Sequence, residues 1–330
     1  MSVNKTRLNR RSLIQAGAAV AVWGAPALTA LVRAQALPTT RLWVGSAPGG
    51  STDTIAREIA PELGRLMGRN VLVENRSGAG GNLAADLVAK SAPDGSNLLV
   101  SFTGHAINAS LYKNLPFDPV ADFTPLTMLT TSHSVLVCNP SQPYRTVGEL
   151  IDYARSRPGK LSMGLGGIGS SVHLAGEAFK MQARLFIVNI PYRGTAPAIQ
   201  DILAGNLEMM FAPFVNTRSL IQAGRLRALG VTSPKRMAQF PDVAAIAEFL
   251  PGYSSQAWFG LFGPARMPAD LARRFSDAAR QAVRGEGVRK RIEGDAGEAV
   301  GSSPEEFAAF VKADIARWAQ LVKYSGATPD

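Results

Sequence analysis

The chain has 330 residues, of which 46% are hydrophobic and 18% charged, and this composition excludes a low-complexity protein. Its length allows one large or two modest hydrophobic cores. The net charge of +10 would suit a nucleic-acid partner, but the first 36 residues hold five bases and no acid, so their removal halves the excess. The tightest remaining group, Arg289-Lys290-Arg291, is interpreted as a solvated helix face, and no nucleic-acid partner is expected.

The N-terminus has the three parts of an export signal. Residues 1–12 are basic and polar, an apolar stretch runs over about 16–32, and Ala34-Gln35-Ala36 fits a small-x-small cleavage site. The pair Arg10-Arg11 indicates the twin-arginine route. A membrane anchor is the alternative, but the stretch is short for spanning a bilayer. We expect residues 1–36 to be a twin-arginine-type signal peptide, cleaved after about Ala36, which leaves a periplasmic protein.

Short apolar runs alternate with helical patterns in the first part of the mature chain. Residues 42–45 predict a strand, and the apolar residues of 55–66 then recur on one face of a helix. Further strands are predicted at 71–74, 98–100 and 135–137, with a second helix over 80–90.

The alternation returns in the second part of the chain. Thr146-Val147-Gly148-Glu149 is a capping box that opens a helix, and Ser303-Pro304-Glu305-Glu306 opens the last one. Between these boxes, strands are predicted around 161–163, 186–190, 207–211, 226–231 and 258–262, and helices from about Ser170 and over 196–203. A short strand is predicted near Val300.

This β-α alternation predicts an α/β protein whose parallel sheets are covered by helices on both faces. The pattern runs twice, near 40–135 and near 145–260, although no tandem sequence repeat is visible. Two such lobes joined by crossing strands would leave a cleft, where small ligands usually bind. The helices after Pro268 are expected to pack back onto the first lobe.

Polar, glycine-containing loops follow predicted strands and open helices. In residues 47–53 (APGGSTD) the glycines let main-chain N–H groups turn toward a ligand, and the helix N-terminus adds partial positive charge. Such a loop binds an anion without a charged side chain, although plain N-capping by Ser51, Thr52 or Asp53 explains this loop equally well. Residues 75–82 resemble a phosphate loop but lack its lysine-serine ending, so a tight βα turn explains them as well. Residues 103–108 again offer hydroxyl and amide donors at a predicted helix start.

The loop 164–171 (GLGGIGSS) contains a formal G-x-G-x-x-G after a predicted strand. A dinucleotide fold also needs an acid about twenty residues later, at the end of the next strand. Residues 186–191 (FIVNIP) contain none. An anion-binding turn with Ser170 and Ser171 as donors is therefore favoured over a nicotinamide site.

The sequence offers no evident catalytic group. The three histidines, His105, His133 and His173, lack metal-ligand spacing, and the single cysteine, Cys138, lies in an apolar run. His173 lies close to a predicted helix start, where a histidine orients or packs more often than it catalyses. H-E-x-x-H and G-x-S-x-G motifs are absent. We expect no catalytic residue, no metal and no cofactor, and hence no enzyme.

Nine short segments stand out along the chain from about Pro38: 48–53 (PGGSTD), 73–82 (VENRSGAGGN), 92–95 (APDG), 105–108 (HAIN), 115–119 (LPFDP), 170–177 (SSVHLAGE), 191–194 (PYRG), 226–233 (LRALGVTS) and 303–307 (SPEEF). By these segments nearly the whole mature chain resembles the receptors of tripartite tricarboxylate transporters, the Bug-type solute-binding proteins. Each segment is weak alone, and the resemblance depends on their order and spacing.

The resemblance implies a two-lobed periplasmic-binding-protein fold of type II kind, with two doubly wound sheets around a ligand cleft. Lobe 1 would comprise 37–137 and 263–330, and lobe 2 would comprise 138–262. It also implies a small carboxylate ligand, a monomeric receptor, and the membrane permease subunits of a tripartite tricarboxylate transporter as partners. Carried over by position, the ligand-binding residues would be Pro48, Gly49, Ser51, Thr52, Asp53, Thr103, Gly104, His105, Gly169, Ser170, Ser171, Thr195, Ala212 and Asn216.

One segment departs from the family pattern. Residues 212–216 read APFVN, where many relatives carry Asp or Gly with Asn soon after Phe. Without an acid there, no partner for a ligand ammonium is evident, so we expect a simple organic acid whose apolar part faces Phe214. Two alternatives stay open: a carboxylate sensor for a membrane signalling protein, and an NAD-dependent oxidoreductase that uses the loop 164–169.

Overall fold

The computed structural model describes residues 37–192, 194–294 and 296–329, so the predicted signal peptide lies outside the described residues. The strands are β1 (Thr39–Val44), β2 (Asn70–Asn75), β3 (Asn97–Phe102), β4 (Phe123–Cys138), β5 (Ser162–Leu165), β6 (Val188–Pro191), β7 (Met209–Pro213), β8 (Arg227–Val231), β9 (Gln256–Pro264) and β10 (Gly297–Ala299). The α-helices are α3 (Ser51–Met67), α4 (Asn82–Ala89), α5 (Gly104–Leu111), α6 (Val147–Arg155), α7 (Ser171–Ala183), α8 (Thr195–Ala204), α9 (Phe214–Gln222), α10 (Ala269–Arg284), α11 (Glu286–Gly294) and α12 (Pro304–Ser325). Two short 3-10 helices are η1 (Ala79–Gly81) and η2 (Ile246–Glu248).

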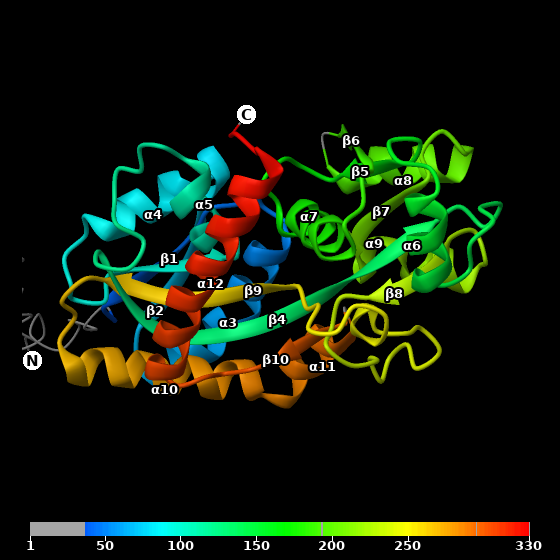
Figure 1. Ribbon diagram of the computed structural model, residues 1–330. Helices are drawn as coiled ribbons and strands as arrows, with labels where there is room; N and C mark the ends of the chain where they lie inside the picture. The colour runs from blue at the N-terminus through cyan, green and yellow to red at the C-terminus, as the bar shows by residue number, and fades with distance from the viewer. Residues whose placement is uncertain (1–36, 193, 295, 330) are drawn as a thin grey trace, which may run out of the picture. The chain divides into compact units, whose positions relative to one another are not determined.

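One long strand, β4, belongs to both halves of the sheet structure (Figure 1). The first half has the order β2-β1-β3-β9-β4, with β10 also paired to β4. The second half has the order β4-β7-β5-β6, with β8 also paired to β4. This is the predicted two-lobed α/β arrangement, in which a strand crosses directly from one lobe to the other.

The strand directions correct one part of the prediction. β1, β2 and β3 are parallel, as are β5, β6 and β7. The strands at the middle of the molecule, β4 and β9, pair antiparallel with each other and with β3 and β7. The prediction of parallel sheets therefore holds for β1 to β3 and for β5 to β7, and it fails for β4 and β9, which carry the chain between the lobes in opposite directions.

Helices cover both faces of each half. In the first half, Leu98 and Val100 pack in a core with α3 and α10, whereas Leu99 between them packs in a core with α4, α5 and α12. In the second half, Leu136 joins a core with α6 and α7, and Val135 and Val137 join a core with α8 and α9. Alternate side chains point to opposite faces of a strand, so these apolar runs are buried on both sides.

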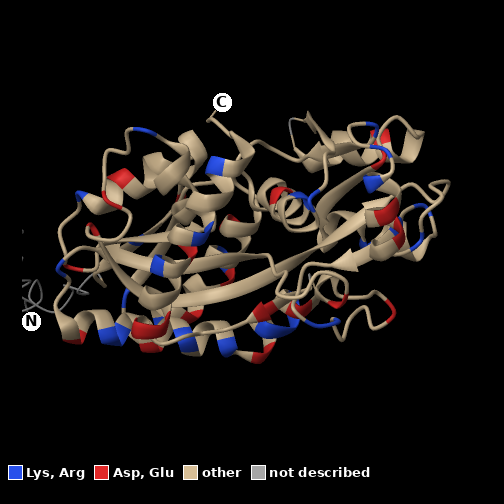
Figure 2. Ribbon diagram, viewed as in Figure 1, with Lys and Arg blue, Asp and Glu red and all other residues tan. Residues whose placement is uncertain are grey.

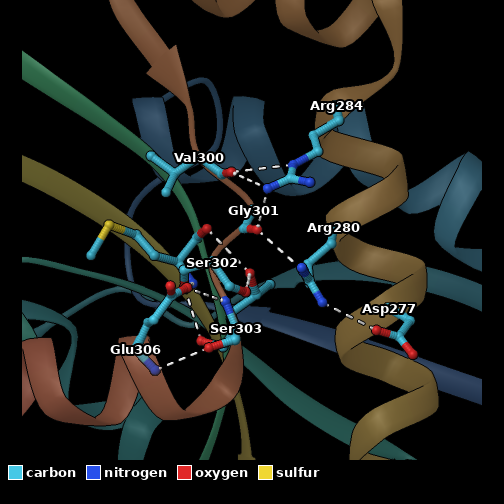
Figure 3. Close-up of polar contacts among 10 residues, drawn as sticks. Asp277, Arg280, Arg284, Val300, Gly301, Ser302, Ser303 and Glu306 are labelled. Carbon is cyan, nitrogen blue, oxygen red and sulfur yellow. Dashed lines mark hydrogen bonds and ion pairs between the residues drawn. The ribbon is translucent and has the colours of Figure 1, made fainter.

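The C-terminal helix is fixed at its start by polar contacts (Figure 3). Ser303 accepts from Glu306 N and the Glu306 carboxylate accepts from Ser303 N, which is the predicted capping box. Arg284 donates to Val300 O and Gly301 O, and Arg280 also donates to Gly301 O. The segment before α12 is thereby attached to α10 of the first half.

Acids and bases are interspersed along α10 and α11 (Figure 2). Each member of the basic triplet on α11 lies near an acid: Arg289 near Glu293, Lys290 near Glu286, and Arg291 near Glu58 of α3. This is the arrangement expected of a solvated helix face.

The chain crosses between the lobes at two adjacent places. On β4, His133 pairs with β9 of the first half, and the next residue, Ser134, pairs with β7 of the second. Ser255, just before β9, donates its N–H to Thr232 O (3.0 Å) and accepts from His133 Nδ1 (3.0 Å). Since β9 pairs wholly within the first half, we propose lobe boundaries near 134 and 255 in place of 138 and 262.

Two elements differ from the sequence prediction. β4 begins at Phe123, although only its last residues were predicted as a strand, and α9 was not predicted at all. No helix among the described residues combines the length and the hydropathy that a bilayer span requires.

Candidate functional site

The predicted site residues lie where parallel strands end and helices begin. In the first half, α3 follows β1 and α5 follows β3; in the second, α7, α8 and α9 follow β5, β6 and β7. The carboxyl ends of neighbouring parallel strands lie at the same edge of a sheet, so the structure groups these residues within each half. We call residues 45–50 the first loop and residues 166–170 the second loop.

Asp53, the third residue of α3, holds the first loop. Its carboxylate accepts from Gly49 N (2.9 Å), from Asn75 Nδ2 (2.9 Å) and from Arg57 Nε (2.9 and 3.0 Å to its two oxygens). Asn75 also donates to Ser46 O, 3.1 Å away. The hydrogen bonds from Arg57, opposed by burial and aided by Gly49 and Asn75, lower the pKa of Asp53 to about 2. Asp53 is thus ionised and committed to bonds within the protein.

His173, the third residue of α7, holds the second loop. Its Nδ1 accepts from Gly169 N at 3.0 Å, and its Nε2 lies 3.5 Å from Glu177 Oε1. Glu177 also accepts from Lys180 Nζ (2.7 Å) and Asn189 Nδ2 (2.8 Å). Burial alone would raise the pKa of Glu177, but hydrogen bonds from His173, Lys180 and Asn189 hold it below its ordinary value.

Ser170 adds to the order of the second loop. Its Oγ donates to Gly167 O (2.7 Å) and accepts from His173 N (3.3 Å), which caps α7. The hydroxyl proton of Ser170 is therefore already donated to an acceptor within the loop. Ser171, the first residue of α7, is half-buried, and its hydroxyl makes no hydrogen bond to the described residues.

The predicted residues at the start of α5 are buried in the core, where Thr103 and His105 make hydrogen bonds within the protein. Thr103 Oγ1 accepts from Trp258 N at 2.8 Å. The ring of His105 is buried between Phe117, Phe123 and Phe262, and its Nε2 donates to Pro119 O at 2.8 Å. Burial lowers the pKa of His105 to about 4, against the hydrogen bond to Pro119. A neutral, buried imidazole cannot serve as the cation for a ligand carboxylate.

The predicted residues of α8, β7 and α9 differ in exposure. Thr195 is half-buried at the first position of α8, Ala212 is buried in β7, and Asn216 is exposed in the first turn of α9. Phe214 is 2% exposed and stacks on Phe240, with ring centroids 4.1 Å apart. Its ring belongs to the core, so the expectation that it faces the ligand was wrong; the exposed apolar residue in this turn is Val215.

Four helices at these strand ends begin without a side-chain cap. They are α3, α5, α8 and α9, whose N-cap residues are Gly50, Thr103, Gly194 and Pro213. The first N–H groups of an α-helix need acceptors from outside it, and the helix dipole makes that end partly positive. Each half therefore offers two helix ends at which an anion could accept main-chain hydrogen bonds.

The glycines of the 164–169 motif are explained by packing. A Cβ on Gly164 would lie 2.6 Å from Leu207, and one on Gly166 would lie 2.8 Å from Thr195 Oγ1. At Gly169 it would lie 2.5 Å from Leu111, and the N–H of Gly169 is already bonded to His173. These contacts account for the motif without a pyrophosphate.

Metal and nucleophile chemistry find no support in the described part of the chain. It holds no group of three His, Cys, Asp or Glu side chains placed to bind a metal ion. Burial raises the pKa of the Cys138 thiol to about 11, so this cysteine is a protonated core residue. Two surface hollows, of about 390 and 260 Å³, are lined by residues of α6 and of α12 and contain none of the predicted site residues.

Sequence reasoning missed the residues that hold the two loops. Arg57 and Asn189 were given no role, Asn75 and Glu177 were named only as members of longer segments, and Asp53 was expected to contact the ligand. A signal was present in the spacing: Gly49, Asp53 and Arg57 are four residues apart, and so are Gly169, His173 and Glu177. Residues four apart lie on one helical face, so a glycine before each helix can be linked to two side chains in series.

Comparison with known proteins decides the family. Residues 55–327 match the family described as the tripartite tricarboxylate transporter family receptor (TctC). The chain belongs to this family. The resemblance seen in the sequence is thereby confirmed, and the family is one of receptors, not of enzymes.

Two individual relatives are similar to this chain over most of its length. A protein from the tcbD-tcbE intergenic region of Pseudomonas sp. (strain P51) is 36% identical over 277 residues, which is 83% of this chain and 82% of that protein. BugT of Bordetella pertussis is 32% identical over 283 residues, covering 85% and 87% of the two chains.

Solved structures of similar proteins share the fold. An R. palustris protein with adipate has a TM-score of 0.76 and 33% identity, covering 88% of this chain and 98% of that one. MatC from Rhodopseudomonas palustris with bound malate has a TM-score of 0.72 and 30% identity, covering 86% and 99%. The periplasmic binding protein BugD has a TM-score of 0.73 and 29% identity, covering 88% and 99%. The two-lobed fold of this TctC-family receptor is the fold of these proteins.

Proposed function

We propose that this protein is an extracytoplasmic receptor that captures a small organic carboxylate between its lobes. The observation that carries the proposal is the set of four uncapped helix N-termini at strand ends, two in each half. Main-chain N–H groups and helix dipoles neutralise a carboxylate without a cationic side chain. A ligand that accepts hydrogen bonds from both lobes would stabilise the conformation in which the lobes are closed on it.

A dicarboxylate with a short apolar chain is the favoured ligand class. Structures of two relatives contain adipate and malate, at 33% and 30% identity to this chain. An amino-acid ligand would need an acceptor for its ammonium group. Asp53 is the one acid among the predicted site residues, and its carboxylate is already bonded to Arg57, Asn75 and Gly49.

The cellular setting is part of the proposal. Residues 1–36 would direct export and be removed after about Ala36, and the mature receptor would act in the periplasm as a monomer. The loaded receptor would deliver its ligand to the membrane permease subunits of a tripartite tricarboxylate transporter, the system after which the family is described.

Calorimetry on the mature protein, refolded to remove co-purified ligand, tests the proposal. Adipate or malate should bind with a dissociation constant on the order of micromolar, and aspartate should bind at least about 10-fold more weakly. No binding by either dicarboxylate at millimolar concentration would contradict the proposed ligand class.

Two serine variants test the site itself. Ser51 and Ser171 are the first residues of α3 and α7, and neither hydroxyl bonds to another described residue. Ser51→Ala and Ser171→Ala should each weaken binding about 10-fold, the value of one charge-assisted hydrogen bond, with little change in thermal stability. Ser219→Ala, on the exposed middle of α9, is the matched control and should bind normally. Equal affinity of all three variants and wild type would exclude these loops as the site.

A further inference from the structure

The loops of the two lobes are held by equivalent bonds. Gly49 and Gly169 both have left-handed backbone conformations, with φ of +80° and +71°. Each donates its N–H to the side chain four residues later: Gly49 to Asp53 Oδ2 at 2.9 Å, and Gly169 to His173 Nδ1 at 3.0 Å. In both cases the acceptor is the third residue of the following helix.

We propose that His173 is a positioning residue for ligand capture. Its imidazole, oriented by Glu177, holds the main-chain N–H of Gly169 and so keeps the second loop in its binding conformation. The proposal rests on the proposed function, since it assigns a role in the same site. It adds that Gly169 serves the site through its conformation and not through its N–H, which is already used.

The bonds of the ring fix its protonation. Nδ1 accepts a hydrogen bond from a main-chain N–H, so Nδ1 carries no proton. The proton of the neutral ring is then on Nε2, which faces Glu177 Oε1 at 3.5 Å. One ring thus connects the loop on one side to a carboxylate on the other, and its orientation is set by both.

Glu177 is itself held in place. The side chains of Glu177 and Lys180 are 3% and 8% exposed, and their charges pair at 2.7 Å. Asn189 of β6 donates to Glu177 and accepts from Lys180 Nζ at 2.9 Å. The chain of contacts therefore runs from a strand of the sheet, through α7, to the loop. A histidine that only filled space would need neither of these two polar partners.

Two substitutions separate the two functions of the ring. In His173→Asn the side-chain oxygen can occupy the position of Nδ1, so the acceptor for Gly169 is kept while the contact to Glu177 is lost. In His173→Gln the longer amide can reach the position of Nε2 and Glu177, but no acceptor remains for Gly169. Both variants lose the buried ring, so both should lose similar stability.

The first readout is hydrogen exchange of the Gly169 amide in the ligand-free mature protein. Exchange should be at least about 10-fold faster in His173→Gln than in His173→Asn, because only the Gln variant frees this N–H. Phe179→Leu, a core substitution on the same helix, is the control for lost stability and should leave Gly169 protected. Equal exchange in the Asn and Gln variants would overturn the proposal.

The second readout is adipate affinity by calorimetry. His173→Gln should bind at least about 10-fold more weakly than wild type, and His173→Asn should stay within about 3-fold. Parallel losses in both variants would mean that the ring has a structural role only. If wild type binds no adipate, the proposed ligand class fails, while the exchange measurement still decides whether His173 holds the loop.

Discussion

In the first loop the N–H of Gly49 is held by a carboxylate, whereas in the second loop the N–H of Gly169 is held by a neutral imidazole. Two features of the surroundings are shared. In each lobe a second side chain four residues further on supports the first, and an asparagine from the neighbouring parallel strand bonds to the ion pair: Asn75 in one lobe, Asn189 in the other.

The difference lies in burial. Arg57, the cation beside Asp53, has a side chain 51% exposed, whereas Lys180, the cation beside Glu177, is 8% exposed. Asp53 belongs to its ion pair, whereas His173 lies beside the Glu177–Lys180 pair, so the two arrangements are similar but not identical. The ion pair is partly exposed in the first lobe and buried in the second, so its loss should have unequal energetic consequences, because desolvation decides what a broken ion pair costs.

Removal of the two carboxylates should give the largest contrast. Glu177→Ala leaves the ammonium of Lys180 buried without a counterion and should lower the free energy of unfolding by about 3–5 kcal/mol. Asp53→Ala leaves Arg57 able to hydrate, so the loss should be about 1–3 kcal/mol. Guanidinium unfolding measures both values. Arg289→Ala, in an exposed pair on α11, is the control, with an expected change of about 0.5 kcal/mol or less. Equal losses in the two carboxylate variants would contradict the role given to burial.

Alanine substitutions of the two glycines should differ less in the stability that they remove. Alanine at either position would have to adopt a left-handed backbone conformation, which costs about 1 kcal/mol of folding free energy. At Gly49 no atom lies within 4 Å of the added methyl group, but at Gly169 the methyl would lie 2.5 Å from the buried Leu111 side chain. Gly169→Ala should therefore destabilise by about 2–3 kcal/mol and Gly49→Ala by about 1 kcal/mol, measured by thermal unfolding. A larger loss at Gly49 would show that the first loop is the more tightly packed of the two.

Low pH should lower the free energy of unfolding, because Asp53 in the first lobe becomes protonated. The pKa of this group is lowered from 3.8 to about 2, so its contribution to stability is present above pH 4 and is lost as the pH falls through about 2. Since Arg57 is half exposed, solvent screening limits this contribution to about 1–2 kcal/mol. Unfolding of wild type and Asp53→Asn at pH 5, 4, 3 and 2.5 measures it, and the difference between them should shrink with the pH. Parallel curves would contradict the assignment.

Most of the fold could be predicted, because its apolar runs and capping residues are local signals. Thr146 and Ser303 were recognised as helix starts, and both side chains make their capping bonds. The early part of β4 was missed because its threonines, such as Thr127 and Thr130, are buried without the usual apolar signature. α9 was missed because it starts directly after Pro213 without a capping side chain.

The candidate site could be predicted only as a set of loops. Glycine-containing segments after strands indicated where an anion would find main-chain donors. The sequence could not show which of those donors are already used, because that depends on partners brought in from other strands. Asn75 reaches Asp53 from β2, and Asn189 reaches Glu177 from β6, and neither contact has a local signature.

The shared strand limits how the lobes can move. His133 and Ser134 are consecutive in β4 yet pair with different halves of the sheet structure, so no flexible linker separates the two lobes at this crossing. Any reorientation of one body must be absorbed as torsion about a few main-chain bonds there and at the neighbouring Ser254-Ser255 segment. Arg317 of α12 donates to the Ser254 carbonyl at 3.1 Å, so the C-terminal helix is bonded to one of the two crossing segments. The lobe closure proposed for ligand capture would therefore act on this contact near the C-terminus of the chain.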